Sequence, residues 1–134
     1  MPGTTGRAID TNVAARYLLG DDAQQTGIAT AIIEAGVLVS TTVLLELGWL
    51  LGSRIGLPRG TIAAVLSQLI DLDSVYVDDI KGVSWAIARY AEGGDLADMI
   101  HLIAAAPAVR FATFDKGIVR SAGPDAPIAV ETLG

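Results

Sequence analysis

Residues 42–52, TVLLELGWLLG, have the composition of a helix that is covered by the rest of the protein. From Val43 to Leu51 every side chain is apolar or absent, except the carboxylate of Glu46. A helix that is apolar on all sides is normally buried, and an ionised carboxylate is costly to bury without a partner. No Lys or Arg lies within a helical turn of Glu46. We therefore expect Glu46 to be buried, with either a functional partner or an interhelix salt bridge.

On both sides of this stretch, short apolar runs alternate with segments of helical spacing. Strands that alternate with helices indicate an α/β fold with a central parallel β-sheet flanked by α-helices, and we expect residues 1–134 to form one domain. Thr41 or Thr42 is the expected N-cap of the helix that contains Glu46. The predicted strands are 7–9, 37–40, 74–79, 109–115 and 127–133, and the predicted helices are 12–20, 21–36, 41–56, 59–72, 80–94, 95–106 and 116–123.

The composition excludes several classes of protein. Half of the 134 residues are apolar and 18% are charged, which excludes a disordered chain. No apolar run is long enough to span a membrane, and the first ten residues lack the pattern of a signal peptide. Without cysteine there is neither a disulfide nor a thiolate metal site. These features favour a cytoplasmic protein with no membrane partner.

The net charge of −6 argues against a nucleic-acid partner, unless several acids are gathered in one site and neutralised by cations. Asp10 and Asp115 each follow a predicted strand, at the edge where parallel sheets form their sites. Asp95 and Asp98 are three residues apart and share one face at the start of a helix. Each of these four acids has a simpler explanation as a helix cap or a turn residue.

Taken together with Glu46, these acids suggest a metal site. Carboxylates that converge repel one another, and a bound cation offsets that repulsion. A site of oxygen ligands without His or Cys suits Mg²⁺ or Mn²⁺ rather than Zn²⁺. Such ions bind phosphate oxygens and activate water, so hydrolysis of a phosphodiester is the expected chemistry.

The order of the motifs resembles the PIN-domain nucleases. The segments IDTN (9–12), Glu46 in an aliphatic helix, DLADMIHLIAAA (95–106) and FATFD (111–115) lie in the order found in that family. Within the family the chain is most similar to the ribonuclease toxins of the VapC type, from toxin–antitoxin pairs. The resemblance covers about residues 7–131.

The resemblance implies a Mg²⁺- or Mn²⁺-dependent ribonuclease of PIN-like fold that cleaves RNA. It also implies a homodimer, and an antitoxin protein whose peptide enters the active-site groove. His101 departs from the family, which more often has an aliphatic residue at this position. The residues carried over by position are the catalytic acids Asp10, Glu46, Asp98 and Asp115, the additional metal ligand Asp95, and the supporting residues Asn12 and Thr113.

Two other functions are open to the sequence. A catalytically inactive PIN-like module that only binds a protein partner would keep the acids as caps. A phosphoryl-transfer or receiver-type domain would use Asp10 or Asp115 as phosphate acceptor, but the segment DTN (10–12) lacks the second aspartate of the phosphohydrolase DxD pattern.

Overall fold

The computed structural model describes residues 6–134. The described chain forms two compact units, and the division falls between Ile80 and Lys81. The prediction of one domain for residues 1–134 stays a prediction. The first five of the ten residues that were predicted to lack a signal-peptide pattern lie outside the described residues. No helix among residues 6–134 is long and apolar enough to cross a membrane.

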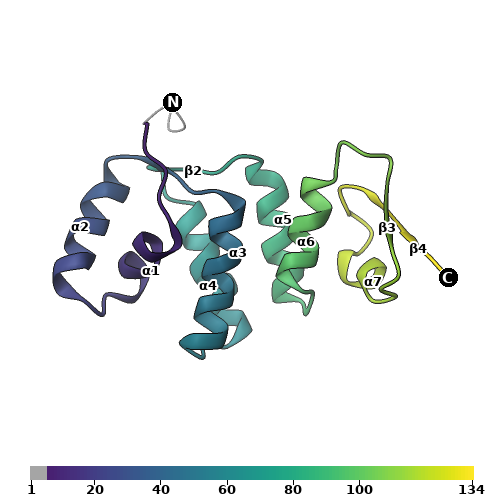
Figure 1. Ribbon diagram of the computed structural model, residues 1–134, viewed down its shortest axis with the longest axis horizontal. Coiled ribbons are helices and arrows are strands. Elements are labelled where there is room, and N and C mark those ends of the chain that lie inside the picture. Colours follow the sequence, from purple (N-terminus) through teal and green to yellow (C-terminus); the bar gives the residue numbers. More distant parts are fainter. Residues whose placement is uncertain (1–5) are drawn as a thin grey trace. The chain divides into compact units, whose positions relative to one another are not determined.

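The first unit is mainly helical (Figure 1). Its strands are short, because β1 and β2 contain two residues each, and they pair in parallel with Val37 opposite Val75. The predicted strand 7–9 is reduced to a single parallel bridge between Ala8 and Leu38. The elements are α1 (Thr11–Leu19), α2 (Ala23–Glu34), β1 (Val37–Leu38), α3 (Thr41–Trp49), the π-helix η2 (Leu50–Arg54), α4 (Arg59–Ile70) and β2 (Val75–Tyr76).

Polar side chains define where these helices begin. The carboxylate of Asp22 accepts a hydrogen bond from the backbone N–H of Gln25 and caps α2. The N-cap of α3 is Ser40, whose hydroxyl accepts from the backbone N–H of Val43 at 3.2 Å. The prediction of Thr41 or Thr42 as this cap was wrong by one or two residues, because the Ser40 hydroxyl reaches the same donors from the last extended position.

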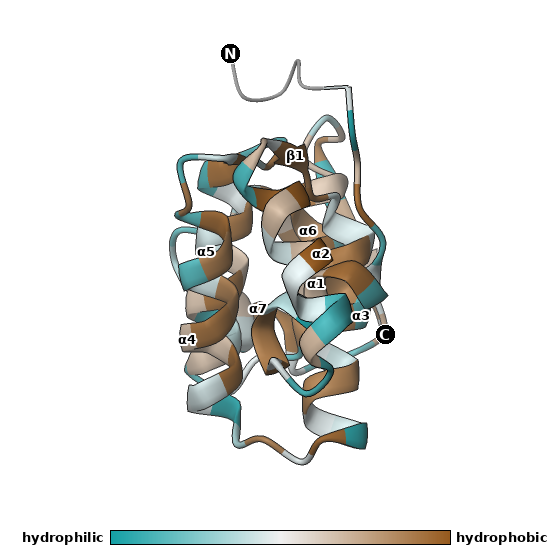
Figure 2. Cartoon of the chain, turned by 90° about the vertical axis from the view of Figure 1, so that its left-hand side faces the viewer, coloured by the Kyte–Doolittle hydropathy of each residue, from teal (hydrophilic) through white to brown (hydrophobic). Residues whose placement is uncertain are grey.

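The core of the first unit contains one face of α3 and one face of α4. Leu44, Leu47 and Leu66 are almost completely buried. Figure 2 shows hydrophobic residues along α4, interrupted by hydrophilic ones. The prediction that α3 is buried all round was wrong: Glu46 is exposed, and 61% of the Trp49 surface is accessible. A helix with a continuous apolar sequence can therefore still present one face to solvent.

The apolar residues of α2 do not all face the core. Ile28, Ile32 and Ala35 share one face by their spacing, but Ile28 and Ala35 are exposed. Ala29 and Ile33 are buried instead. The helix is apolar on more than one side, so its spacing did not determine which side faces the core.

The second unit contains three helices and a parallel pair of strands. Strand β3 pairs with β4 from Arg110 opposite Ala129 to Thr113 opposite Thr132, and α7 lies against β4 (Figure 1). The buried residues of α6 include Met99 and Leu102. The elements are α5 (Ile80–Ala91), α6 (Leu96–Ala104), β3 (Arg110–Thr113), α7 (Ile118–Ala122) and β4 (Ala129–Thr132). Both strand pairs are parallel, which confirms the α/β class predicted from the sequence.

Candidate active site

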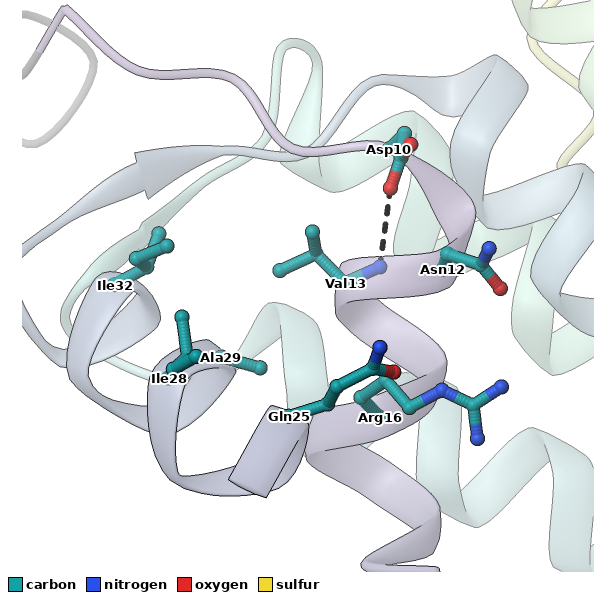
Figure 3. A pocket seen from close by; sticks show the side chains of 8 residues that line it. All are labelled: Asp10, Asn12, Val13, Arg16, Gln25, Ile28, Ala29 and Ile32. Atoms are coloured by element: carbon teal, nitrogen blue, oxygen red, sulfur yellow. Dashed lines mark hydrogen bonds between the residues drawn. The ribbon is translucent and has the colours of Figure 1, made fainter. Parts of the chain in front are cut away.

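Asp10 is the N-cap of α1. Its backbone is extended, and its Oδ1 accepts a hydrogen bond of 3.0 Å from the backbone N–H of Val13 (Figure 3). This cap occupies one carboxylate oxygen with a donor of the first helical turn. The side chain of Asp10 is exposed. The capping role and a functional role are therefore compatible in the same residue.

Glu46 lies against the start of α1. The hydroxyl of Thr11 donates a hydrogen bond of 3.1 Å to Oε1 of Glu46. Thr11 follows Asp10 directly. The bond from Thr11 therefore places the carboxylate of Glu46, on α3, beside the start of α1, where Asp10 lies. Glu46 is exposed, and the expectation that it is a buried carboxylate was wrong. Its partner is a neutral hydroxyl rather than an Arg or Lys.

Asp95 and Asp98 occupy the first turn of α6. Asp95 is the N-cap, and its Oδ1 accepts a hydrogen bond of 3.0 Å from the backbone N–H of Asp98. Asp95 is exposed and Asp98 is half-buried. The cap uses the carboxylate of Asp95 and the backbone N–H of Asp98. The carboxylate of Asp98 takes no part in this cap, so it is available to bind a ligand.

The protonation equilibrium of Asp98 differs from that of an ordinary aspartate. Partial burial raises the pKa of Asp98, and the negative charges of Asp95 and Asp115 raise it further, while His101 acts in the opposite direction. Asp95 and Asp115 therefore each lie close enough to Asp98 in the second unit to repel its negative charge. Three of the acids predicted from the sequence form one electrostatic cluster.

Asp115 is held in a tight turn after β3. Its backbone N–H donates to the hydroxyl of Thr113 at 3.0 Å, and its Oδ1 accepts from the backbone N–H of Gly117 at 2.8 Å. Both bonds join residues two positions apart, as in the local turns that Ser, Thr and Asp side chains form. The hydroxyl of Thr113 therefore supports Asp115 by binding the backbone N–H of Asp115.

Thr11 is the functional candidate that sequence reasoning missed. Its position directly after a strand-end aspartate was visible in the segment DTN (10–12). However, its partner Glu46 is 35 residues away, and no local pattern indicates that contact. Asn12, which was predicted to support the site, is exposed on the first turn of α1, and His101 is also exposed.

A cavity of about 350 Å³ lies between α1 and α2, beside Asp10. Figure 3 shows aliphatic side chains from both helices on one side of it and Asp10, Asn12 and the polar ends of Gln25 and Arg16 on the other. Arg16 also forms an ion pair of 2.7 Å with Asp21. The residues that line the cavity are Asp10, Asn12, Val13, Arg16, Gln25, Ile28, Ala29 and Ile32.

The donor chemistry of these acids fits a hard divalent cation. Within either unit, among residues 6–134, no group of three or more acids or histidines is arranged as a formed metal site. The donors present are carboxylate oxygens, which Mg²⁺ and Mn²⁺ prefer. The mutual repulsion at Asp98 is the kind that a bound cation relieves.

The motifs and the parallel α/β elements agree with a comparison to known protein families. A model of the PIN domain matches residues 8–123, and the chain belongs to the PIN domain family. No curated protein and no solved structure matches it. PIN domains are generally nucleases that bind nucleic acid and use divalent metal ions.

Proposed function

We propose that this protein is a Mg²⁺- or Mn²⁺-dependent ribonuclease that acts as the toxin of a VapC-type toxin–antitoxin pair. The observation that supports the proposal is the match of residues 8–123 to the PIN domain. Within this match Asp95 and Asp115 lie near the half-buried Asp98, and together with its burial they raise the pKa of Asp98. A purely capping role explains Asp95, whose carboxylate binds the N–H of Asp98, but it does not explain the position of Asp98 beside two other acids.

The metal ligands in this proposal are Asp10, Glu46, Asp95, Asp98 and Asp115. A bound Mg²⁺ or Mn²⁺ would polarise the phosphate and increase the acidity of the attacking water. One of these carboxylates would accept the proton of the attacking water.

Other residues hold the acids in place. The Thr11 hydroxyl fixes one oxygen of Glu46, and the turn from Thr113 to Gly117 fixes the backbone and one oxygen of Asp115. Asn12 is proposed to support the site from the first turn of α1. Preorganised groups of this kind reduce the reorganisation needed during the reaction.

The proposal includes two protein partners. The cavity beside Asp10 has an aliphatic side and an exposed Ile28, which suits an apolar residue of an antitoxin peptide. Exposed Trp49 and Ile55 lie close together in the sequence and offer an apolar surface for a homodimer. The proposed location is the cytoplasm, where the RNA substrate is made.

The experiment that tests the function compares cleavage of labelled single-stranded RNA by the wild type, Asp98→Asn and Asp125→Asn. Each protein is assayed with Mg²⁺, Mn²⁺ or EDTA. We expect metal-dependent cleavage by the wild type and by Asp125→Asn, in which an exposed acid outside the cluster loses the same charge. Asp98→Asn should retain its circular dichroism spectrum and lose most of the activity.

The competing function is an inactive PIN-like module that only binds protein. It predicts no cleavage by any of the three proteins, together with normal antitoxin binding. Equal metal-independent cleavage by wild type and Asp98→Asn would instead identify a contaminating nuclease and remove the support for an active site at Asp98.

A further inference from the structure

Arg89 connects two helices of the second unit. It lies in the last turn of α5 and is half-buried. Its Nε donates a hydrogen bond of 2.7 Å to the backbone carbonyl of Ser121, which lies in the last turn of α7. Carbonyls at the end of a helix lack partners within the helix. The guanidinium therefore satisfies one of these carbonyls and joins the ends of α5 and α7.

Two glycines allow the chain to pack closely around Arg89. The backbone N–H of Gly94 donates to the carbonyl of Arg89 at 2.9 Å. A Cβ on Gly94 would lie 3.0 Å from that carbonyl oxygen and 3.5 Å from Cβ of Ser121. A Cβ on Gly123 would lie 3.2 Å from Cζ of Arg89. Two segments, one at Gly94 and one from Ser121 to Gly123, thus contact Arg89, and a glycine in each of them leaves room for the close approach.

Both segments that contact Arg89 are continuous with acids of the cluster. Gly94 directly precedes Asp95, the N-cap of α6. Helix α7 begins directly after Gly117, whose N–H binds Asp115. We infer that Arg89 is a positioning residue: its guanidinium holds the end of α7, and with it the Asp115 turn, against the end of α5. The backbone carbonyl of the same residue binds the N–H of Gly94, which precedes the Asp95–Asp98 turn. The catalytic consequence of this inference rests on the proposed function.

The chemistry of arginine suits this role. Within residues 6–134 Arg89 forms no ion pair, so its bonding is directed to a neutral backbone carbonyl. A lysine lacks the Nε donor and the planar guanidinium that lies against Gly123. Lysine retains the positive charge but not the geometry. The comparison of Arg89→Lys with Arg89→Met therefore separates the effect of charge from that of the contact.

The test uses the full chain and measures the Mn²⁺ concentration that gives half-maximal RNA cleavage. Loss of a residue that supports metal ligands typically changes metal affinity or activity by about 10- to 100-fold. We expect about a 10-fold increase in this concentration for Arg89→Met and an intermediate increase for Arg89→Lys. Ile87→Val is the matched control, because it removes one methyl group from the buried face of the same helix.

A residue that only stabilises the fold would give a different result. If Arg89→Met and Ile87→Val lower the melting temperature similarly and neither changes the Mn²⁺ dependence, the inference is wrong. The expected result is a change in Mn²⁺ dependence for Arg89→Met that is absent in Ile87→Val.

A second measurement is independent of catalysis. Backbone amide exchange of Asp98 and Gly117 reports the hydrogen bonds to Asp95 and Asp115 directly. We expect Arg89→Met to accelerate exchange at Gly117 more than at Asp98, because the backbone bond from Gly94 to residue 89 persists in the variant. Exchange at Val13, whose N–H binds Asp10 in the first unit, should not change. If the wild type cleaves no RNA, the proposed function fails, and amide exchange still decides the inference. Unchanged exchange at Gly117 would overturn the positioning role.

Discussion

The hydroxyl of Thr11 donates a hydrogen bond of 3.1 Å to the carboxylate of Glu46, across a separation of 35 residues. This contact places a carboxylate of α3 next to the residue that follows Asp10. It also orients the carboxylate of Glu46 through a neutral donor. The hydroxyl leaves the negative charge intact, whereas an Arg or Lys would neutralise it.

Thr11→Val removes this donor and preserves the shape of the side chain. We expect RNA cleavage to fall several-fold, because Glu46 loses its fixed orientation. The free energy of unfolding should fall by no more than about 1 kcal/mol, since a hydrogen bond between exposed groups contributes little net stability. Thr11→Ser keeps the hydroxyl and should retain most of the activity. Cleavage kinetics and urea denaturation of both variants test this, and equal activity in all three proteins would refute a role for the contact.

Two substitutions of Asp10 separate its role as a helix cap from its proposed role in catalysis. Asp10→Asn retains a side-chain oxygen for the N–H of Val13, so its stability should remain close to that of the wild type. Asp10→Ala lacks the cap and should lose about 1 kcal/mol of stability. We expect both variants to lose RNA cleavage. Thermal denaturation and cleavage assays check this prediction, and an active Asp10→Asn variant would leave the cap as the sole function of Asp10.

Asp98→Asn should increase stability at neutral pH. The pKa of Asp98 is raised in the folded state by burial and by Asp95 and Asp115, so folding favours its neutral form. Its contribution to stability is complete below the unfolded pKa of 3.8 and is lost as the pH rises through the folded pKa. The variant should therefore be more stable than the wild type at pH 7, and the difference should shrink as the pH falls through the raised folded pKa and disappear below the unfolded pKa of 3.8.

Urea denaturation of wild type and Asp98→Asn between pH 3 and pH 8 measures this difference in metal-free buffer. Asp125→Asn serves as a control for the loss of one negative charge at an exposed site. If Asp98→Asn is less stable than the wild type at pH 7, the carboxylates of the cluster do not repel one another as inferred.

Much of the fold was predictable because its signals are local. Helix α1 ends at Gly20, and Asp22 begins α2, as glycine and aspartate do in many helices. The acids at the starts of α1 and α6 were identified for the same reason, since Asp10 and Asp95 cap their helices.

The exposure of Glu46 was not predictable, because it depends on which faces of neighbouring helices pack together. The sequence around Glu46 is apolar on every side, so its spacing does not indicate which face is buried. The packing of Leu44 and Leu47 in the core turns Glu46 outward. The contacts of Thr11 and Arg89 join residues distant in the sequence, and no single motif contains either pair.

Trp49 tests the proposed homodimer. Because 61% of its surface is accessible, Trp49→Ser should change the free energy of unfolding of the monomer by no more than about 0.5 kcal/mol. An aromatic residue at the centre of an interface typically contributes about 2 kcal/mol or more to binding. We therefore expect the dissociation constant of the dimer to increase by roughly 30-fold. Sedimentation velocity over a range of concentrations measures this change. Val119→Ser, at an exposed apolar position of the second unit, is the control and should leave the dimer intact. A dimer equally stable in wild type and Trp49→Ser would place its interface elsewhere on the chain.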